Sequence, residues 1–233
     1  MIIVLSLFTL NLSAVEKNKE TKKAVGNYLD RMYSKKASIK LLERNRNEIY
    51  RLKVIIANFG KDGKDSASQL KKVLKDYKEG MKLYYTNNYI TAARVLKKNR
   101  EDIASLYKIM LAVYRKQTQE LLGKCADELV NEELKGTTSP SVNTDANVQL
   151  VEQGKLKLRV AYGQYNMATD ALKHRRMAQS IAHLRVARYH GVYMLIALAK
   201  DEKEKKQLKS NYKTYLLDSE NIAEKPFEFD VNK

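Results

Sequence analysis

Apolar residues recur three or four positions apart along residues 89–134, which is the pattern of one face of an α-helix. This segment contains no proline and only one glycine, Gly123. The apolar positions are Ala92, Leu96, Ile103, Leu106, Tyr107, Met110, Leu111, Tyr114, Leu121, Leu122, Cys125 and Leu129. A stripe of this width needs cover from at least two neighbouring helices. We therefore predict one very long helix around which the rest of the chain is organised.

Similar spacing predicts two helices before it. The first runs from about residue 17 to Phe59 and stops at Gly60, although a break near Ser34 would make it a pair of helices. The motif Ser66-x-x-Gln69 has the pattern of a capping box. It predicts a second helix over residues 67–85.

The segment after the long helix lacks any periodicity, and its glycine, serine, threonine and asparagine content is typical of a flexible linker, which we place at residues 136–147. Two further helices are predicted over residues 150–173 and 177–217. The apolar stripe of the first of these consists of Leu156, Val160, Tyr162, Met167 and Leu172. Residues 218–233 are acidic, lack a stripe and are predicted to form an extended tail.

The composition supports an all-α fold. Two prolines, nine glycines, no tryptophan and 30% charged residues suit long helices better than a turn-rich β fold. We predict an elongated long-helix bundle. Its expected parts are a signal peptide (1–14), an N-terminal long-helix region (15–135), the linker (136–147), a helical hairpin packed on the first region (148–217) and the tail (218–233).

An internal repeat appears when the chain is shifted by 88 residues, because Tyr77 then falls on Tyr165 and Gly80 on Ala168. Small residues at helix crossings and an aromatic residue after the turn resemble the tetratricopeptide (TPR) family. The matching positions are Gly80, Tyr89, Ala92 and Leu96 in the first copy and Ala168, Met177, Ser180, Leu184 and Ala187 in the second. The chain departs from that family in lacking the closing proline and in its longer second helix. The resemblance covers about a third of the chain and implies hairpin packing.

Positive charge is concentrated in two parts of the chain, one before and one after the predicted long central helix. Residues 15–85 carry 19 basic and 9 acidic residues, and residues 148–217 carry 14 and 5. Such a field attracts acidic proteins, anionic polymers or lipid head groups. We expect docking on acidic protein surfaces, while a membrane surface stays open as a partner and nucleic acid is disfavoured. The expected partner-binding residues are Arg44, Arg46, Arg51, Asn99, Arg100, Arg185 and Arg188.

Two short segments of the chain resemble each other, because Asn45-Arg46 and Asn99-Arg100 occur in similar predicted helical contexts. These pairs are interpreted either as binding partner carboxylates or as polar interruptions of a stripe whose arginine stems cover apolar surface. Tyr33 and Tyr50 are expected to be exposed and to serve as anchors in an interface.

Motifs for catalysis are missing from the sequence. It has no glycine-rich phosphate loop, no Gly-x-Ser-x-Gly motif and no His-x-x-x-His pair. The histidines, His174, His183 and His190, do not form a metal-ligand pattern, and Cys125 on the apolar stripe is expected to be a buried thiol. We therefore expect neither an enzyme nor a protein with a cofactor.

Met1–Ala14 is uncharged and largely apolar, and it resembles a signal peptide, although no basic residue follows Met1. The alternative is a buried N-terminal helix or strand. A signal-like start, lysine-rich long helices and TPR-like packing resemble the periplasmic helical proteins of spirochaetes, including the coiling and sheath proteins of their flagella. This resemblance implies a periplasmic or secreted structural protein in an envelope or flagellar filament sheath assembly. The alternatives are a module that binds an anionic polymer or nucleic acid, and a cytosolic adaptor.

Overall fold

The protein is all-α in the computed structural model, which describes residues 27–138 and 145–224. The helices in these ranges are α1 (Tyr28–Phe59), α2 (Ser66–Tyr85), α3 (Tyr89–Thr138), α4 (Asp145–Lys173), α5 (Met177–Leu198), α6 (Glu202–Asn211) and α7 (Lys213–Ser219). No strand occurs among the described residues. The predicted fold class is confirmed.

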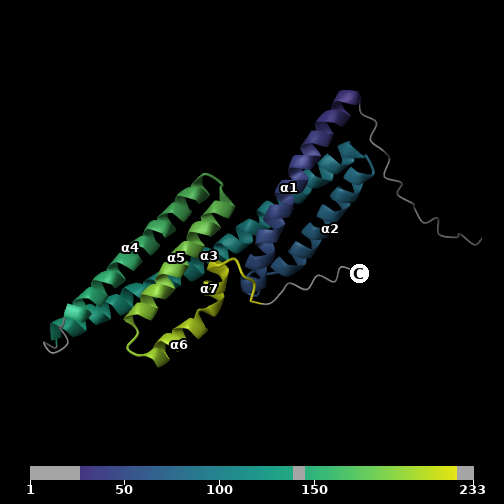
Figure 1. The fold of residues 1–233 in the computed structure, drawn as a ribbon. Helices are drawn as coiled ribbons and strands as arrows, with labels where there is room; N and C mark the ends of the chain where they lie inside the picture. The colour runs from purple at the N-terminus through teal and green to yellow at the C-terminus, as the bar shows by residue number, and fades with distance from the viewer. Residues whose placement is uncertain (1–26, 139–144, 225–233) are drawn as a thin grey trace, which may run out of the picture.

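Helix α3 is the axis of the molecule. It spans 50 residues, which corresponds to a length of about 75 Å. Helices α1 and α2 pack on its first half, and α4 and α5 pack on its second half (Figure 1). All twelve apolar positions of the predicted stripe are buried. The prediction of one long central helix is therefore confirmed.

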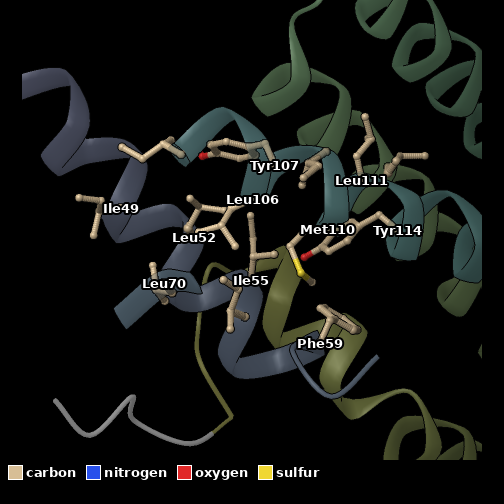
Figure 2. Packing of buried hydrophobic residues seen from close by; sticks show 14 of the residues in the cluster. Ile49, Leu52, Ile55, Phe59, Leu70, Leu106, Tyr107, Met110, Leu111 and Tyr114 are labelled. Atoms are coloured by element: carbon tan, nitrogen blue, oxygen red, sulfur yellow. The ribbon is translucent and has the colours of Figure 1, made fainter. Parts of the chain in front are cut away.

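The main hydrophobic core lies where α1, α2, α3 and the start of α5 meet. Figure 2 shows Leu52 and Ile55 of α1 pointing toward Leu106 and Met110 of α3. These four side chains are at most 2% exposed. A second cluster joins the later part of α3 to α5. Two cores along one axis explain the elongated shape, because each half of α3 is covered by its own neighbours.

Helix α1 is continuous through Ser34, so the alternative of a broken helix is wrong. Its start is fixed by a capping box that was not predicted: the Asp30 amide donates to Asn27 Oδ1 at 2.8 Å, and the Asn27 amide donates to Asp30 Oδ2 at 3.3 Å. The helix ends at Phe59 and is followed by Gly60, as predicted. The predicted helical residues 17–26 lie outside the described ranges.

The predicted capping box of α2 is not formed. Ser66 is already the first residue of the helix, after Asp65 with a left-handed φ of 56°. The buried Ser66 hydroxyl instead donates to the Gly60 carbonyl at 3.0 Å. The serine therefore fastens α2 to the end of α1, because the left-handed residue turns the loop back toward that helix.

The turns of the two helical hairpins, which lie 88 residues apart in the sequence, have the same conformation. Asn87 and Arg175 have positive φ values of 60° and 57°. The Asn88 amide donates to Leu83 O at 2.9 Å, and the Arg176 amide donates to Ala171 O at 2.8 Å. These two turns are thus alike in conformation, while the internal repeat and the TPR resemblance stay predictions.

The apolar stripe predicted for α4 does not face the core. Four of its five residues, Leu156, Val160, Tyr162 and Met167, are exposed. The buried positions are small residues: Gly154, Ala161, Ala168 and Ala171. A Cβ on Gly154 would lie 3.0 Å from Leu129 Cδ1. Helix α4 therefore approaches its neighbours closely through a face that hydrophobicity alone does not reveal.

The predicted helix over residues 177–217 is interrupted. Helix α5 ends at Leu198, Ala199 is extended, and Asp201 caps α6 by accepting from the Glu204 amide at 2.7 Å. A second break at Tyr212 separates α6 from α7. These breaks redirect the chain, so α7 packs on α5 and α1.

Two predicted boundaries also differ from the structure. Helix α3 reaches Thr138 and α4 begins at Asp145, so both overlap the predicted linker, and residues 139–144 lie outside the described ranges. Asp218, predicted to begin an extended tail, is a buried residue of α7. Residues 1–14, predicted as a signal peptide, and residues 225–233 of the tail are also outside the described ranges.

Candidate functional site: an arginine-lined groove

A groove with a volume of about 1090 Å³ lies between α1, α3 and the start of α5. Seven arginines line it: Arg44, Arg46, Arg51, Arg100, Arg175, Arg176 and Arg185. We call this site the arginine groove. Glu48 is its single acidic lining residue. The groove is therefore a strongly positive concave surface.

Helical periodicity explains how three elements contribute to the groove. On α1, Arg44, Glu48 and Arg51 are four and three residues apart and lie on one face. On α3 the same spacing applies to Arg100, Ala104 and Tyr107, and on α5 to Ala178, Ala182 and Arg185. Arg175 and Arg176 come from the α4–α5 turn. Each helix thus buries one face in the core and presents an adjoining face to the groove.

The buried pair Asn45 and Asn99 sets the position of α1 on α3. Asn45 Nδ2 donates to Asn99 Oδ1 at 3.0 Å and to Leu96 O at 2.9 Å. Asn99 Nδ2 donates to Val73 O of α2 at 2.7 Å. Both asparagines are fully buried. The two similar sequence segments therefore have similar roles in the structure. Their asparagines join α1, α2 and α3 through hydrogen bonds, and the arginines that follow them, Arg46 and Arg100, line the groove.

Five groove arginines form no ion pair or side-chain hydrogen bond that involves other described residues: Arg44, Arg46, Arg100, Arg175 and Arg176. Glu48 accepts a hydrogen bond from the Tyr107 hydroxyl at 2.5 Å, and its other oxygen lies 3.7 Å from Arg51. Burial and this bond raise the pKa of Tyr107 above its ordinary value. The single groove carboxylate is thus already engaged.

Neighbouring positive charge acts on Arg100. Its pKa is lowered from the ordinary value, first by partial burial and then by the charge of Arg44. Arg46 and Arg44 are exposed, as are Arg51, Arg175 and Arg176. The groove therefore holds several accessible guanidinium groups whose mutual repulsion an anionic ligand would relieve.

Arg185 connects the groove to a buried charge cluster. Its Nη2 donates to Asp218 Oδ1 at 2.9 Å and its Nε to Asp218 Oδ2 at 3.2 Å. Arg188, one helical turn later, donates from Nη2 to Asp218 Oδ2 at 2.7 Å, and the Tyr114 hydroxyl donates to the same oxygen at 2.8 Å. One carboxylate thus faces two guanidinium groups, which leaves an excess positive charge beside the groove.

Aromatic rings complete the surroundings of Arg188. Its guanidinium carbon lies 3.9 Å from the ring centroid of Tyr114, 4.4 Å from that of Phe59 and 4.6 Å from that of Tyr215. Such cation–π contacts favour a desolvated cation. Asp218 is buried because it is the counter-charge of this cation, which explains why it does not belong to an extended tail.

The structure separates the seven predicted partner-binding residues into two groups. Arg44, Arg46, Arg51, Arg100 and Arg185 come together in the groove. Asn99 and Arg188 are fully buried, so they do not belong to the exposed surface. Arg175 and Arg176 were not among the predicted site residues, and their signal is the basic turn between two predicted helices. Tyr50, predicted as an exposed anchor, lines the groove and is 60% exposed.

Other features of the described residues are not associated with the groove. Cys125 is buried, as expected, and burial raises the pKa of its thiol to about 12. Among the described residues no cluster of histidine, cysteine or carboxylate side chains is arranged to hold a metal ion. None of the described helices combines the length and the apolar character needed to cross a membrane.

Comparison with protein families, with curated proteins and with solved structures gave no match for this chain.

Proposed function

We propose that the protein is a non-enzymatic interaction protein that docks an acidic segment of a partner protein in the arginine groove. The observation that carries this proposal is the convergence of seven arginines from α1, α3, α5 and the α4–α5 turn around one engaged carboxylate. Charges of one sign in a concave surface attract and orient a partner of opposite sign. The partly exposed Tyr50 offers an aromatic contact at the same place.

The proposed setting is an assembly outside the cytoplasm, in the envelope or in a periplasmic flagellar filament sheath. The signal-like segment Met1–Ala14 and the resemblance to spirochaete periplasmic helical proteins support it. N-terminal sequencing of the protein from its native source tests this part. We expect a mature start near Val15, and an intact Met1 would contradict export.

Binding of a fluorescently labelled peptide rich in glutamate, followed by anisotropy, tests the docking site. The variant Arg44→Glu, Arg46→Glu, Arg51→Glu should lose binding and keep its helix content. The matched control is Lys71→Glu, Lys75→Glu, Lys78→Glu, which makes the same charge change at exposed positions of α2 outside the groove.

We expect the control to retain most of the affinity, because its three lysines are exposed and do not line the groove, and salt weakens the interaction of such charges with a ligand held in the groove. Equal losses in the two variants would show that only net charge matters, and the groove would then not be the docking site. A single-stranded DNA probe in the same assay addresses the alternative of nucleic-acid binding. Tighter binding of DNA than of the peptide at the same salt concentration would favour that alternative.

A further inference from the structure

All the positively charged residues that line the groove are arginines. The chain contains 12 arginines and 32 lysines. Seven of the arginines line the groove, and no lysine is among its lining residues. An eighth, Arg188, is buried beside Arg185 and shares its carboxylate partner. The remaining four, Arg31, Arg94, Arg115 and Arg159, are exposed elsewhere. Lysines would serve equally well to attract anions by charge alone, and the chain contains nearly three times as many lysines as arginines. The exclusive use of arginine in the groove therefore needs a further reason.

Guanidinium and ammonium groups differ in what they recognise. The guanidinium group is planar and presents two parallel N–H donors to a carboxylate or phosphate, while lysine acts as a compact point charge. The molecule itself contains an example, because Arg185 donates hydrogen bonds from Nε and Nη2 to the two carboxylate oxygens of Asp218. Arg44, Arg46, Arg100, Arg175 and Arg176 have no such partner among the described residues.

On this basis, and resting on the proposed function, we infer that the groove recognises individual side-chain carboxylates of its protein partner through paired guanidinium hydrogen bonds. The recognition is thus a matter of geometry as well as of charge. Arg44 and Arg51 are seven residues apart on one face of α1, which sets their backbones about 10 Å apart along the helix axis. Arg100 approaches from α3. A partner segment with carboxylates at comparable spacing fits these three groups.

The apolar residues of the groove lining favour carboxylates on a polypeptide over phosphates on a nucleic acid. The lining also includes Ala104, Met177, Ala178 and Ala182, which are partly or fully exposed. The small alanine side chains allow the backbone of a partner to approach, and together with Met177 they give its apolar side chains a surface to cover. Tyr107 is buried, so Tyr50 is the one accessible ring of the lining, whereas single-stranded nucleic acid binding uses a series of rings for stacking.

A charge-conserving exchange tests this inference. The variant Arg44→Lys, Arg51→Lys, Arg100→Lys keeps the net charge and the long-range field but removes three guanidinium forks. The matched control is Arg31→Lys, Arg94→Lys, Arg115→Lys, at exposed positions outside the groove. Both proteins are titrated with the same labelled peptide of glutamate and leucine, and helix content and the thermal midpoint are compared with wild type.

We expect the groove variant to bind the peptide at least about tenfold more weakly, the fold-change for loss of a charge-assisted hydrogen bond. The control should bind like wild type. Wild-type affinity in the groove variant would overturn the inference and leave the proposed docking function intact. No binding by wild type would overturn the docking function itself. If the groove variant loses affinity for single-stranded DNA and not for the peptide, the assignment to carboxylates is wrong.

Discussion

Arg188 and the arginines of the groove differ in how their charges are compensated. Arg188 has no exposed surface, contacts three aromatic rings and is paired with Asp218. Arg44 and Arg46, by contrast, are exposed and form no ion pair with described residues. Arg185 belongs to both places, because it lines the groove and binds Asp218. The difference shows that one residue type stabilises the fold where a carboxylate and aromatic rings replace water, and stays available to a ligand where they do not.

The largest expected effect comes from removing the shared carboxylate. Asp218→Ala leaves the buried guanidinium of Arg188 without its counter-charge, so we expect the free energy of unfolding to fall by about 3–5 kcal/mol. Urea denaturation followed by circular dichroism measures this change. Hydrogen exchange should show increased opening of α7, because that helix carries Asp218 into contact with α5.

The double variant Arg188→Met, Asp218→Ala separates the ion pair from simple loss of packing. It removes the charges of Arg188 and Asp218, leaves the less deeply buried Arg185 in place, and keeps an apolar side chain among the aromatic rings. We expect it to be more stable than Asp218→Ala alone, since buried pairs are costly chiefly when one partner is left behind. An equal or larger loss in the double variant would contradict the charge argument.

The loss of stability at alkaline pH allows a tyrosine at the groove to be compared with a tyrosine in the buried charge cluster. Burial and a neighbouring carboxylate raise the pKa of both Tyr107 and Tyr114, next to Glu48 and Asp218 respectively. The unfolded chain therefore loses these protons at lower pH than the folded protein. Stability is fully present below about pH 10 and falls above it, by about 1.4 kcal/mol per pH unit for each tyrosine.

Tyr107→Phe and Tyr114→Phe should each reduce this alkaline slope, and the double variant should reduce it further. Stability curves measured by denaturant between neutral and alkaline pH give the slopes. Tyr33→Phe, at an exposed tyrosine, controls for the loss of a hydroxyl group. Slopes that are identical in all variants would show that other groups cause the alkaline loss.

The smallest expected effect is a gain in stability at the groove. Arg100→Gln removes a partly buried charge that lies near Arg44. Because solvent screens these charges, we expect the free energy of unfolding to rise by only about 0.2–0.5 kcal/mol. Arg94→Gln on the same helix, at an exposed position outside the groove, is the control. A loss above 1 kcal/mol in Arg100→Gln would show that this arginine supports the fold in the way that Arg188 does.

Part of the groove could be predicted from the sequence, because charge is a local property. Arg44, Arg46, Arg51, Arg100 and Arg185 were expected to bind a partner, and they line one site. Their convergence could not be predicted, since it depends on how α5 packs against α1 and α3. The contribution of Arg175 and Arg176 has the same origin, because the α4–α5 turn reaches the groove only in the folded molecule.

The sequence by itself determined the elements whose signals are local. The twelve-residue apolar stripe of α3 and the stop at Gly60 follow from helical periodicity and terminator chemistry, and the structure agrees with both. The break before α6 also has a local signal, the N-cap residue Asp201 followed by Glu204, which the prediction of one continuous helix did not include.

Tertiary structure alone decided which polar residues are buried. Asn99 and Arg188 were read as surface residues and Asp218 as part of a tail, yet all three are fully buried. Their burial depends on partners far away in sequence: Asn45 for Asn99, and Asp218 and the Phe59 ring for Arg188. A polar side chain can leave water only where hydrogen bonds and counter-charges replace it, and distant helices supply these only after they have packed.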